Sequence, residues 1–302
     1  MNLKFKGNMD RRNMLKGLGV AGIAATGIAS NRSSIAQETS PTEGASIFSG
    51  ERPLEGKVAI VTGARANIGR GIAIGLAEMG ADILVHYHRP ETVSQAEETA
   101  RLSREAGAKT ALAVGDLGKR TNVTQMFDIA DRELGGADIL INNAGKIVKK
   151  PIAELTDEDY LEVWNINEWG TFLCMREAAN RLNNRGRIIN IVTAIVPSLT
   201  ANYGGYAAPK AANAQLVRTL SAEIGGSDRA ITVNSVHPGP VDTPFFRDPE
   251  SDEAIEYATG LANLKRLGRV SDVVPMVQFL ASPAAQWITG ESLFVAGGYT
   301  ES

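Results

Sequence analysis

The sequence predicts an α/β fold in which a doubly wound parallel sheet carries helices on both faces. Strand-like apolar runs alternate with helical runs from residue 57 to residue 295, and neither a linker nor a repeat interrupts them. Alternation of this kind is typical of a parallel sheet covered by helices. The 302 residues could form one large or two small domains, and 43% apolar residues suffice for a core. We therefore expect a single domain.

A glycine-rich turn, residues 62–71, follows the first predicted strand, residues 57–61. The strand is short, apolar and β-branched, which indicates burial on both faces. Apolar residues at helical spacing follow the turn and end at Gly80. Glycines let a backbone approach a pyrophosphate, and the helix N-terminus supplies N–H groups and a positive dipole. Strand, turn and helix predict the first half of a Rossmann-like dinucleotide-binding unit.

Tyr206 and Lys210 stand four residues apart at the start of a predicted helix, residues 206–224. Residues at this spacing lie on one face of a helix. A cation beside a phenol lowers the pKa of the phenol and provides an acid/base closer to neutral pH. Pro209 lies between the two, and proline is tolerated only in the first turn of a helix. We therefore expect the helix to begin near Gly205 or Tyr206.

Further motifs accompany these two in a fixed order along the chain. They are Asp116 after the strand-like run 110–114, the Asn-Asn-Ala-Gly run 142–145, Asn167, Thr193 thirteen residues before Tyr206, and the Pro-Gly segment 238–243. Together with the glycine turn, they resemble the short-chain dehydrogenase/reductase family in its single-domain branch, over residues 53–300. The glycine pattern is longer than that of sugar epimerases, and the chain lacks their larger C-terminal substrate domain.

The resemblance implies a catalytic set and a cofactor site. Tyr206 corresponds to the acid/base, and Thr193, where the family usually has Ser, would hydrogen-bond the substrate oxygen. Lys210 would bind ribose hydroxyls, and Asn167 would hold a water that links Lys210 to solvent. The expected cofactor-binding residues are Gly63, Arg65, Asn67, Ile68, Gly69, His88, Arg89, Asp116, Leu117, Asn143, Ala144, Gly145, Tyr206, Lys210, Pro238, Gly239, Val241 and Thr243.

Besides Pro209, two positions depart from the pattern of the family. Asn67 replaces the second glycine of the turn, and asparagine is the residue other than glycine that best tolerates a left-handed backbone. We therefore expect cofactor binding to survive. Thr193 keeps the hydroxyl of Ser but adds a methyl group that stiffens its side chain. This departure bears on rate and on the fit of bulky substrates.

The end of the second predicted strand indicates NADP(H) as the cofactor, in preference to NAD(H). NAD enzymes usually place a carboxylate there for the ribose 2′-hydroxyl, but no carboxylate occurs here before Glu91. Arg89 can engage a 2′-phosphate, His88 can add a donor, and Arg65 can approach from the glycine turn. The histidines of the chain are not at ligand spacing, so we expect no metal site.

The N-terminus carries a twin-arginine signature at Arg11 and Arg12, followed by a mildly apolar stretch, residues 18–29. That stretch is too short to span a bilayer, which needs about 17–25 residues, and resembles a signal h-region. We expect a signal peptide over 1–36, cut after Ala36, a flexible linker over 37–52 and the enzyme domain over 53–302. These features predict export by the twin-arginine machinery to the periplasm; a chain whose signal is unused would stay cytoplasmic.

The charge and the residue content of the chain indicate which kinds of partner to expect. The full chain has a net charge of −3, and loss of the basic signal would make it more acidic, which argues against nucleic acid. The only cysteine, Cys174, lies in an apolar helical run and is expected to be buried. We expect a homo-oligomer, a tetramer or a dimer, that pairs the helix 206–224 through its small residues Ala207, Ala211, Ala212 and Ala214.

The predicted function is an NADP(H)-dependent oxidoreductase that transfers hydride between nicotinamide and a carbonyl or secondary alcohol. The alternative is a nucleotide-binding sensor or partner protein that has lost catalysis, which the intact Asn167, Tyr206 and Lys210 argue against. The expected substrate lining, residues 147–150, 194–203 and 245–264, mixes aromatic with acidic side chains. The sequence leaves the substrate class open.

Overall fold

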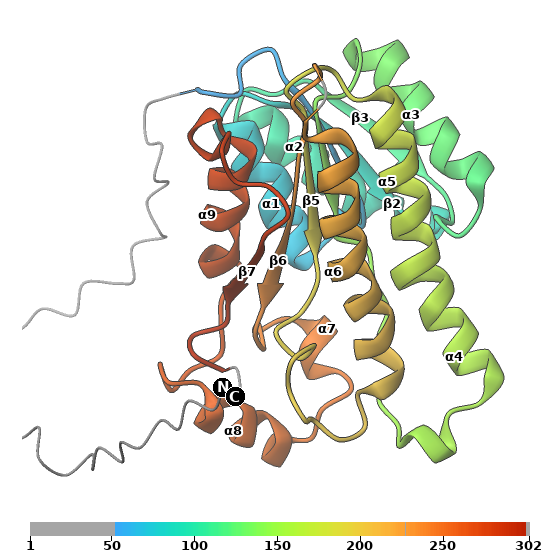
Figure 1. Ribbon diagram of the computed structural model, residues 1–302, viewed down its shortest axis with the longest axis vertical. Helices are drawn as coiled ribbons and strands as arrows, with labels where there is room; N and C mark the ends of the chain where they lie inside the picture. Colours follow the sequence, from blue (N-terminus) through green and yellow to red (C-terminus); the bar gives the residue numbers. More distant parts are fainter. Residues whose placement is uncertain (1–51, 227, 300–302) are drawn as a thin grey trace, which may run out of the picture. The chain divides into compact units, whose positions relative to one another are not determined.

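The computed structural model describes residues 52–226 and 228–299. Its centre is a seven-stranded sheet with the order β3-β2-β1-β4-β5-β6-β7, in which all neighbouring strands are parallel (Figure 1). This confirms the predicted fold class. The strands are β1 (Val58–Val61), β2 (Asp82–Tyr87), β3 (Thr110–Val114), β4 (Ile139–Asn142), β5 (Arg187–Ile191), β6 (Thr232–Pro238) and β7 (Ser292–Val295).

Helices cover both faces of this sheet (Figure 1). One layer holds α1 (Asn67–Glu78), α2 (Val93–Glu105) and α9 (Val270–Ala281), and the other holds α3 (Arg120–Leu134), α5 (Gly170–Arg181) and α6 (Gly204–Ile224). The π-helical turn η3 (Asn165–Trp169) joins α4 (Asp157–Trp164) to α5. The short α7 (Pro244–Arg247) and α8 (Asp252–Leu261) lie beyond the ends of β6 and β7 (Figure 1).

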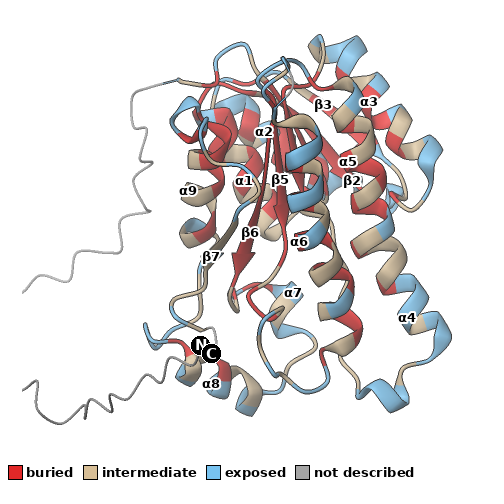
Figure 2. Cartoon of the chain, viewed as in Figure 1, coloured by how far each residue is buried: buried red, intermediate tan, exposed pale blue. Residues whose placement is uncertain are grey.

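The central strand β1 is apolar throughout because both of its faces are buried (Figure 2). In β1, Ala59 and Val61 belong to the core under α1 and α9, whereas Ile60 belongs to the core under α3 and α5. Cys174 is fully buried in the second of these cores, as expected. The sheet therefore forms a rigid platform, and its carboxyl edge presents the loops that carry the site.

Chain order reverses beside β1, because β2 lies on one side of this strand and β4 on the other. The loops after β1 and β4 consequently diverge and leave a crevice at the carboxyl edge, which is where ligands bind in sheets of this class. The loops after β5 and β6 extend the same edge.

Helix α6 starts within one residue of the position predicted for it. We expected α6 to begin near Gly205 or Tyr206, but it begins at Gly204, because the Tyr203 carbonyl accepts the amides of Tyr206 and Ala207 at 3.0 and 2.8 Å. Pro209 therefore lies beyond the first turn, where its missing N–H removes one hydrogen bond from the helix.

The predicted signal peptide, residues 1–36, and residues 37–51 of the predicted linker lie outside the described residues. Among the helices over 52–226 and 228–299, none combines the length and the apolar character needed to cross a membrane.

Candidate active site

The glycine turn and the loop after β4 pack against each other with little spare room. Gly63 has φ +62°, and a Cβ added there would lie 2.9 Å from Cα of Ala144. A Cβ added to Gly69 would lie 2.5 Å from Nδ2 of Asn143. Asn67 has φ +53°, so the expected left-handed asparagine is confirmed. The turn thus brings bare backbone and the N-terminus of α1 to the crevice, the arrangement that suits a pyrophosphate.

His86, at the end of β2, positions this turn, although the sequence analysis did not include it in the site. The side chain is only 2% exposed. Its Nδ1 accepts the Gly63 amide at 3.2 Å, so Nε2 carries the proton and donates to the Gly115 carbonyl at 3.0 Å. Burial lowers the pKa of His86 to about 4, which keeps the ring neutral. Its place at the buried end of a strand next to the glycine turn is the signal that could have identified it.

Basic side chains gather at the outer end of the crevice. His88 and Arg89 are exposed after β2, and no ion pair engages either of them within the described part of the chain. Arg65 reaches the same region and donates to the Gln95 side chain. Across from them, Asp116 accepts the Gly118 amide at 2.9 Å. The exposed guanidinium of Arg89 can meet a phosphate without first breaking an ion pair.

Tyr206 and Thr193 form the centre of the site. The Tyr206 side chain is buried and hydrogen-bonds the Thr193 hydroxyl. Burial raises the pKa of Tyr206 to about 12, and the bond with Thr193 opposes this shift only in part. The phenol is therefore protonated at neutral pH and can donate a proton.

Lys210 does not act on Tyr206 in the way the sequence predicted. We expected its ammonium to lower the pKa of the phenol, but burial of the phenol dominates that pKa. The Lys210 amine donates to the Ile191 carbonyl at 2.8 Å, and burial lowers its own pKa to about 8. Lys210 is thus a buried amine that titrates close to neutral pH, next to the acid.

Asn167 lies behind the cavity wall in the π-helical turn η3. Its amide pairs with the backbone of Lys146, donating to the carbonyl at 2.7 Å and accepting the N–H at 2.8 Å. A Cβ added to Gly145 would lie 3.2 Å from Oδ1 of Asn167 and 3.5 Å from Nζ of Lys210. The two polar groups therefore flank one glycine, so the π-helical turn holds Asn167 next to Lys210.

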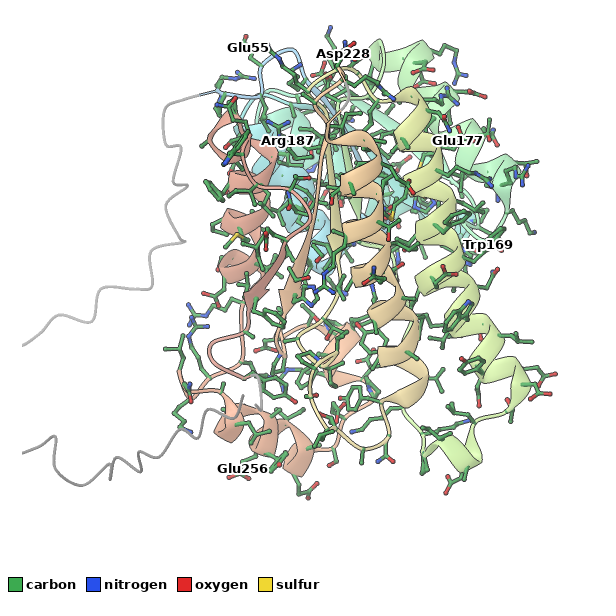
Figure 3. All side chains as sticks on the ribbon, in the orientation of Figure 1. Glu55, Trp169, Glu177, Arg187, Asp228 and Glu256 are labelled. Carbon is green, nitrogen blue, oxygen red and sulfur yellow. The ribbon has the colours of Figure 1, made fainter. Side chains whose placement is uncertain are left out.

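Two further residues fix this turn. Asn213, one turn after Lys210 on α6, donates to the Asn167 carbonyl at 2.5 Å. Trp169, labelled in Figure 3, closes the turn and donates from its indole to the Gly118 carbonyl at 3.1 Å. Neither residue was predicted from the sequence to belong to the site, since a polar residue on a helix and a tryptophan carry no motif by themselves.

One cavity of about 490 Å³ joins all of these groups. Every predicted catalytic and cofactor-binding residue lines it except Asn167, which is bonded to the lining residue Lys146. The lining also includes residues that were not predicted as cofactor or catalytic groups: His86, Tyr87, Thr92, Glu162, Ile166, Ile191 and Tyr299 among them. Among the described side chains, no group of three His, Cys, Asp or Glu is arranged to hold a metal ion.

Known proteins share this arrangement over most of the chain. Residues 63–300 match the family described as enoyl-(acyl carrier protein) reductase. A short-chain type dehydrogenase/reductase of Picea abies is 39% identical over 253 residues, 81% of this chain and 93% of that protein. An Arabidopsis thaliana protein described as NADPH-dependent aldehyde reductase-like and chloroplastic is 37% identical, over 82% of this chain and 95% of that protein.

Solved structures agree. A dehydrogenase from Burkholderia cenocepacia with bound NADP is 36% identical, with a TM-score of 0.80 over 83% of this chain and 96% of that chain. A blue fluorescent protein from a metagenomic library, in complex with NADPH, is 34% identical, with a TM-score of 0.78 over 82% of this chain and 100% of that chain. The chain belongs to the short-chain dehydrogenase/reductase family of oxidoreductases.

Proposed function

We propose that this protein is an NADP(H)-dependent oxidoreductase that interconverts a carbonyl compound and the corresponding alcohol. The observation that carries the proposal is the buried pair of Tyr206 and Thr193, which opens into the same cavity as the glycine turn and Arg89. A protonated phenol and a second hydroxyl thus lie on the path from the nucleotide cradle to the rest of the cavity.

The residues present fit the cofactor. Gly63 and Gly69 keep the turn free of side chains that would collide with the loop after β4, and α1 points its N-terminus at the crevice. Arg89, His88 and Arg65 would hold the 2′-phosphate, and Asp116 and Leu117 the adenine. Lys210 and Tyr206 would bind the ribose next to the nicotinamide, with Pro238, Gly239, Val241 and Thr243 around the ring. The relatives that bind NADP or NADPH support this assignment.

The protein residues supply the proton chemistry. NADPH, when bound, would supply the hydride that the carbonyl carbon accepts. Tyr206 then gives its phenolic proton to the oxygen, which completes the alcohol and leaves a phenolate. Thr193 donates a hydrogen bond to the same oxygen as negative charge develops on it. Lys210, with a pKa of about 8, returns a proton toward Tyr206, and Asn167 keeps this amine connected to solvent through a water.

Nicotinamide absorbance, followed with panels of aldehydes, ketones and alcohols, tests the proposal directly. We expect NADPH to be oxidised by a carbonyl substrate faster than NADH, and Tyr206→Phe to bind NADPH without turning over. A folded protein that binds NADPH but reduces nothing in a broad panel would support the alternative, a sensor that has lost catalysis. A protein that binds no nucleotide would contradict both.

We further propose that the protein is exported and acts as a homo-oligomer. The twin-arginine pair supports export. Trp287 is 96% exposed and Phe294, on the edge strand β7, is 45% exposed, which supports a covering partner at that edge. On α6, Ala207, Ala211 and Ala212 are partly exposed, but Ala214 is buried within the chain and is not available for helix pairing. Light scattering of the purified protein would give its mass.

A further inference from the structure

The cavity continues past Tyr206 into a chamber with apolar and aromatic walls. Tyr203 and Ile195 pack with Tyr206 in one buried cluster, and Ile147 lies against it. Phe245 of α7 also lines the cavity, with its ring centroid 6.3 Å from that of Tyr206 at an interplanar angle of 56°. We name this end, beyond the phenol of Tyr206, the substrate chamber.

Glu250 is turned away from this chamber and is fully engaged. It lies between α7 and α8, its side chain is 3% exposed, and it does not line the cavity. Its carboxylate accepts a hydrogen bond from the Tyr203 hydroxyl and forms an ion pair with Lys149. The Lys149 ammonium also lies 5.4 Å from the centre of the Tyr203 ring. Glu250 therefore holds an aromatic wall in place, and each of its two carboxylate oxygens already has a donor within the chain.

The other charges around the chamber are paired in the same way. Lys146 pairs with Glu162, the one acid that lines this end of the cavity. Lys150 pairs with Asp159 at 2.5 Å, and Arg247 pairs with Asp242 at the same distance. The amine of Lys210 is directed at the Ile191 carbonyl.

This pairing excludes two classes of ligand. Lys146, Lys149, Lys150 and Arg247 already pair with acids, and Lys210 donates to the Ile191 carbonyl and is assigned to the ribose by the proposed function. A carboxylate or phosphate that enters the chamber would therefore lose its water with little compensation, and burial of an uncompensated charge is costly. A sugar would place several hydroxyls against ring faces, where each unpaired hydroxyl costs about 1–3 kcal/mol. Among the phenols that line the cavity beside Tyr206, that of Tyr203 already donates to Glu250.

We propose that the substrate chamber takes an uncharged, planar aromatic aldehyde or ketone. Its ring lies between the rings of Tyr203 and Phe245, and its carbonyl oxygen faces Tyr206 and Thr193. Aromatic rings favour offset or tilted contact with one another, at a gain beyond the area they bury. This assignment rests on the proposed function. The sequence predicted a lining of mixed aromatic and acidic residues, whereas in the structure the aromatic residues form the walls and Glu250 supports them from behind.

Three matched ketones test the proposal without turnover. Acetophenone, 4-acetylbenzoate and cyclohexyl methyl ketone are titrated by ligand-observed NMR into full-length protein saturated with NADP⁺, which cannot reduce them. We expect acetophenone to bind at least about tenfold more tightly than 4-acetylbenzoate, which carries a charge that the chamber does not compensate. We expect it to bind about two- to tenfold more tightly than cyclohexyl methyl ketone, which has similar size but no flat ring.

Variants assign the preference to the chamber. Phe245→Leu keeps apolar bulk but removes the plane of the ring, so acetophenone and cyclohexyl methyl ketone should then bind about equally. Tyr257→Leu is the matched control, because Tyr257 is an exposed aromatic residue on α8 outside the cavity. It should leave the preference for acetophenone unchanged.

The outcomes separate the two levels of inference. Saturable NADP⁺ binding is measured first, and its failure contradicts the proposed function. Where NADP⁺ binds, the chamber assignment is overturned if none of the ketones binds, if 4-acetylbenzoate binds as well as acetophenone, or if the saturated ring binds as well as the aromatic one. It is also overturned if Phe245→Leu leaves the preference intact.

Discussion

Glu250 accepts a hydrogen bond from the phenol of Tyr203, whose backbone carbonyl in turn accepts the amides of Tyr206 and Ala207. The segment after α7 is therefore bonded to the residue that starts the catalytic helix. Because Phe245 lies on α7, five residues before Glu250, and packs against Tyr206, the wall of the chamber and the phenol of Tyr206 are held by connected parts of the chain. We therefore expect a displacement of the chamber wall at Phe245 to displace Tyr206 as well.

The Glu250–Tyr203 bond should show energetic coupling. We expect Tyr203→Phe and Glu250→Gln each to lower the free energy of unfolding and to raise KM more than they lower kcat. Both changes disturb the aromatic wall of the chamber, but Tyr206 remains as the proton donor. A hydrogen bond to a buried charged group contributes about 1.5–3 kcal/mol, so the double variant should be less destabilised than the sum of the single variants by about that amount. Urea unfolding of the four proteins gives the coupling. Additive losses would show that the bond contributes nothing.

Tyr206→Phe should abolish most turnover while the fold and cofactor affinity are kept. The phenylalanine ring preserves the packing with Ile195 but has no proton to give. We expect kcat to fall by about 10²–10⁴, the range for a general acid–base group. Steady-state kinetics and NADPH fluorescence titration measure the two quantities.

Two substitutions of Thr193 test the role of its hydroxyl group. Thr193→Ser keeps the hydroxyl and should keep or raise activity, whereas Thr193→Val keeps the shape, loses the hydroxyl and should lose most of the activity. Full activity in Tyr206→Phe would exclude the phenol as the acid.

Arg89 should select the cofactor. Its guanidinium is exposed and has no ion-pair partner among the described side chains, so its replacement disturbs little else. We expect Arg89→Ala to weaken NADPH binding by about 1.5–3 kcal/mol, the scale for a hydrogen bond to a charged group, and to leave NADH binding nearly unchanged. Fluorescence titration with both cofactors measures this. Equal losses for the two would show that Arg89 does not contact the 2′-phosphate.

Buried Lys210 should make stability depend on alkaline pH. Burial lowers the pKa of Lys210 from 10.5 to about 8, so between these values the unfolded chain binds the proton that the folded chain has lost. Its contribution to the free energy of unfolding therefore rises with pH across this window, by about 3 kcal/mol in total. Tyr206 acts in the opposite direction, but only above its usual pKa of 10.

The test compares wild type with Lys210→Met in urea between about pH 7.5 and 9.5, below the range in which Tyr206 contributes. The free energy of unfolding of the wild type minus that of Lys210→Met should increase as pH rises. A constant difference would mean that the folded and unfolded states titrate this lysine alike.

The sequence predicted the sheet and the nucleotide cradle because both depend on local patterns. A strand buried on both faces is apolar at every position, as β1 shows, and a turn that approaches a ligand needs Gly63, Gly69 and the left-handed Asn67. The four-residue spacing on α6 placed Tyr206 and Lys210 on one face in the same way.

The other features of the site could not be predicted from local patterns, because they depend on contacts between distant segments of the chain. His86 reaches Gly63 across 23 positions, and Tyr203 meets Glu250 across 47. The pKa of Tyr206 is governed by burial, which the whole fold determines, so the nearby lysine gave the wrong expectation. The sequence was equally compatible with Glu250 as an acid that faces the substrate. The pairing of Glu250 with Lys149 is what places it behind the aromatic wall.

The last prediction joins the signal to the chemistry. We expect Arg11→Lys combined with Arg12→Lys to retain the protein in the cytoplasm, because this pair defines the predicted export signal. An exported enzyme finds little free NADPH, so we expect it to leave the cell interior with nucleotide bound and to recycle it with a second substrate. Retention through many turnovers requires a binding free energy near −12 kcal/mol or better, a dissociation constant of about 1 nM.

Cell fractionation of the wild type and the double variant tests the first half. Gel filtration of the exported protein, followed by denaturation and adenine absorbance of the released small molecules, tests the second. An unchanged location of the double variant would remove the twin-arginine assignment. An exported protein that carries no nucleotide would keep that assignment but contradict tight retention, because the open crevice beside Arg89 would then exchange its cofactor freely.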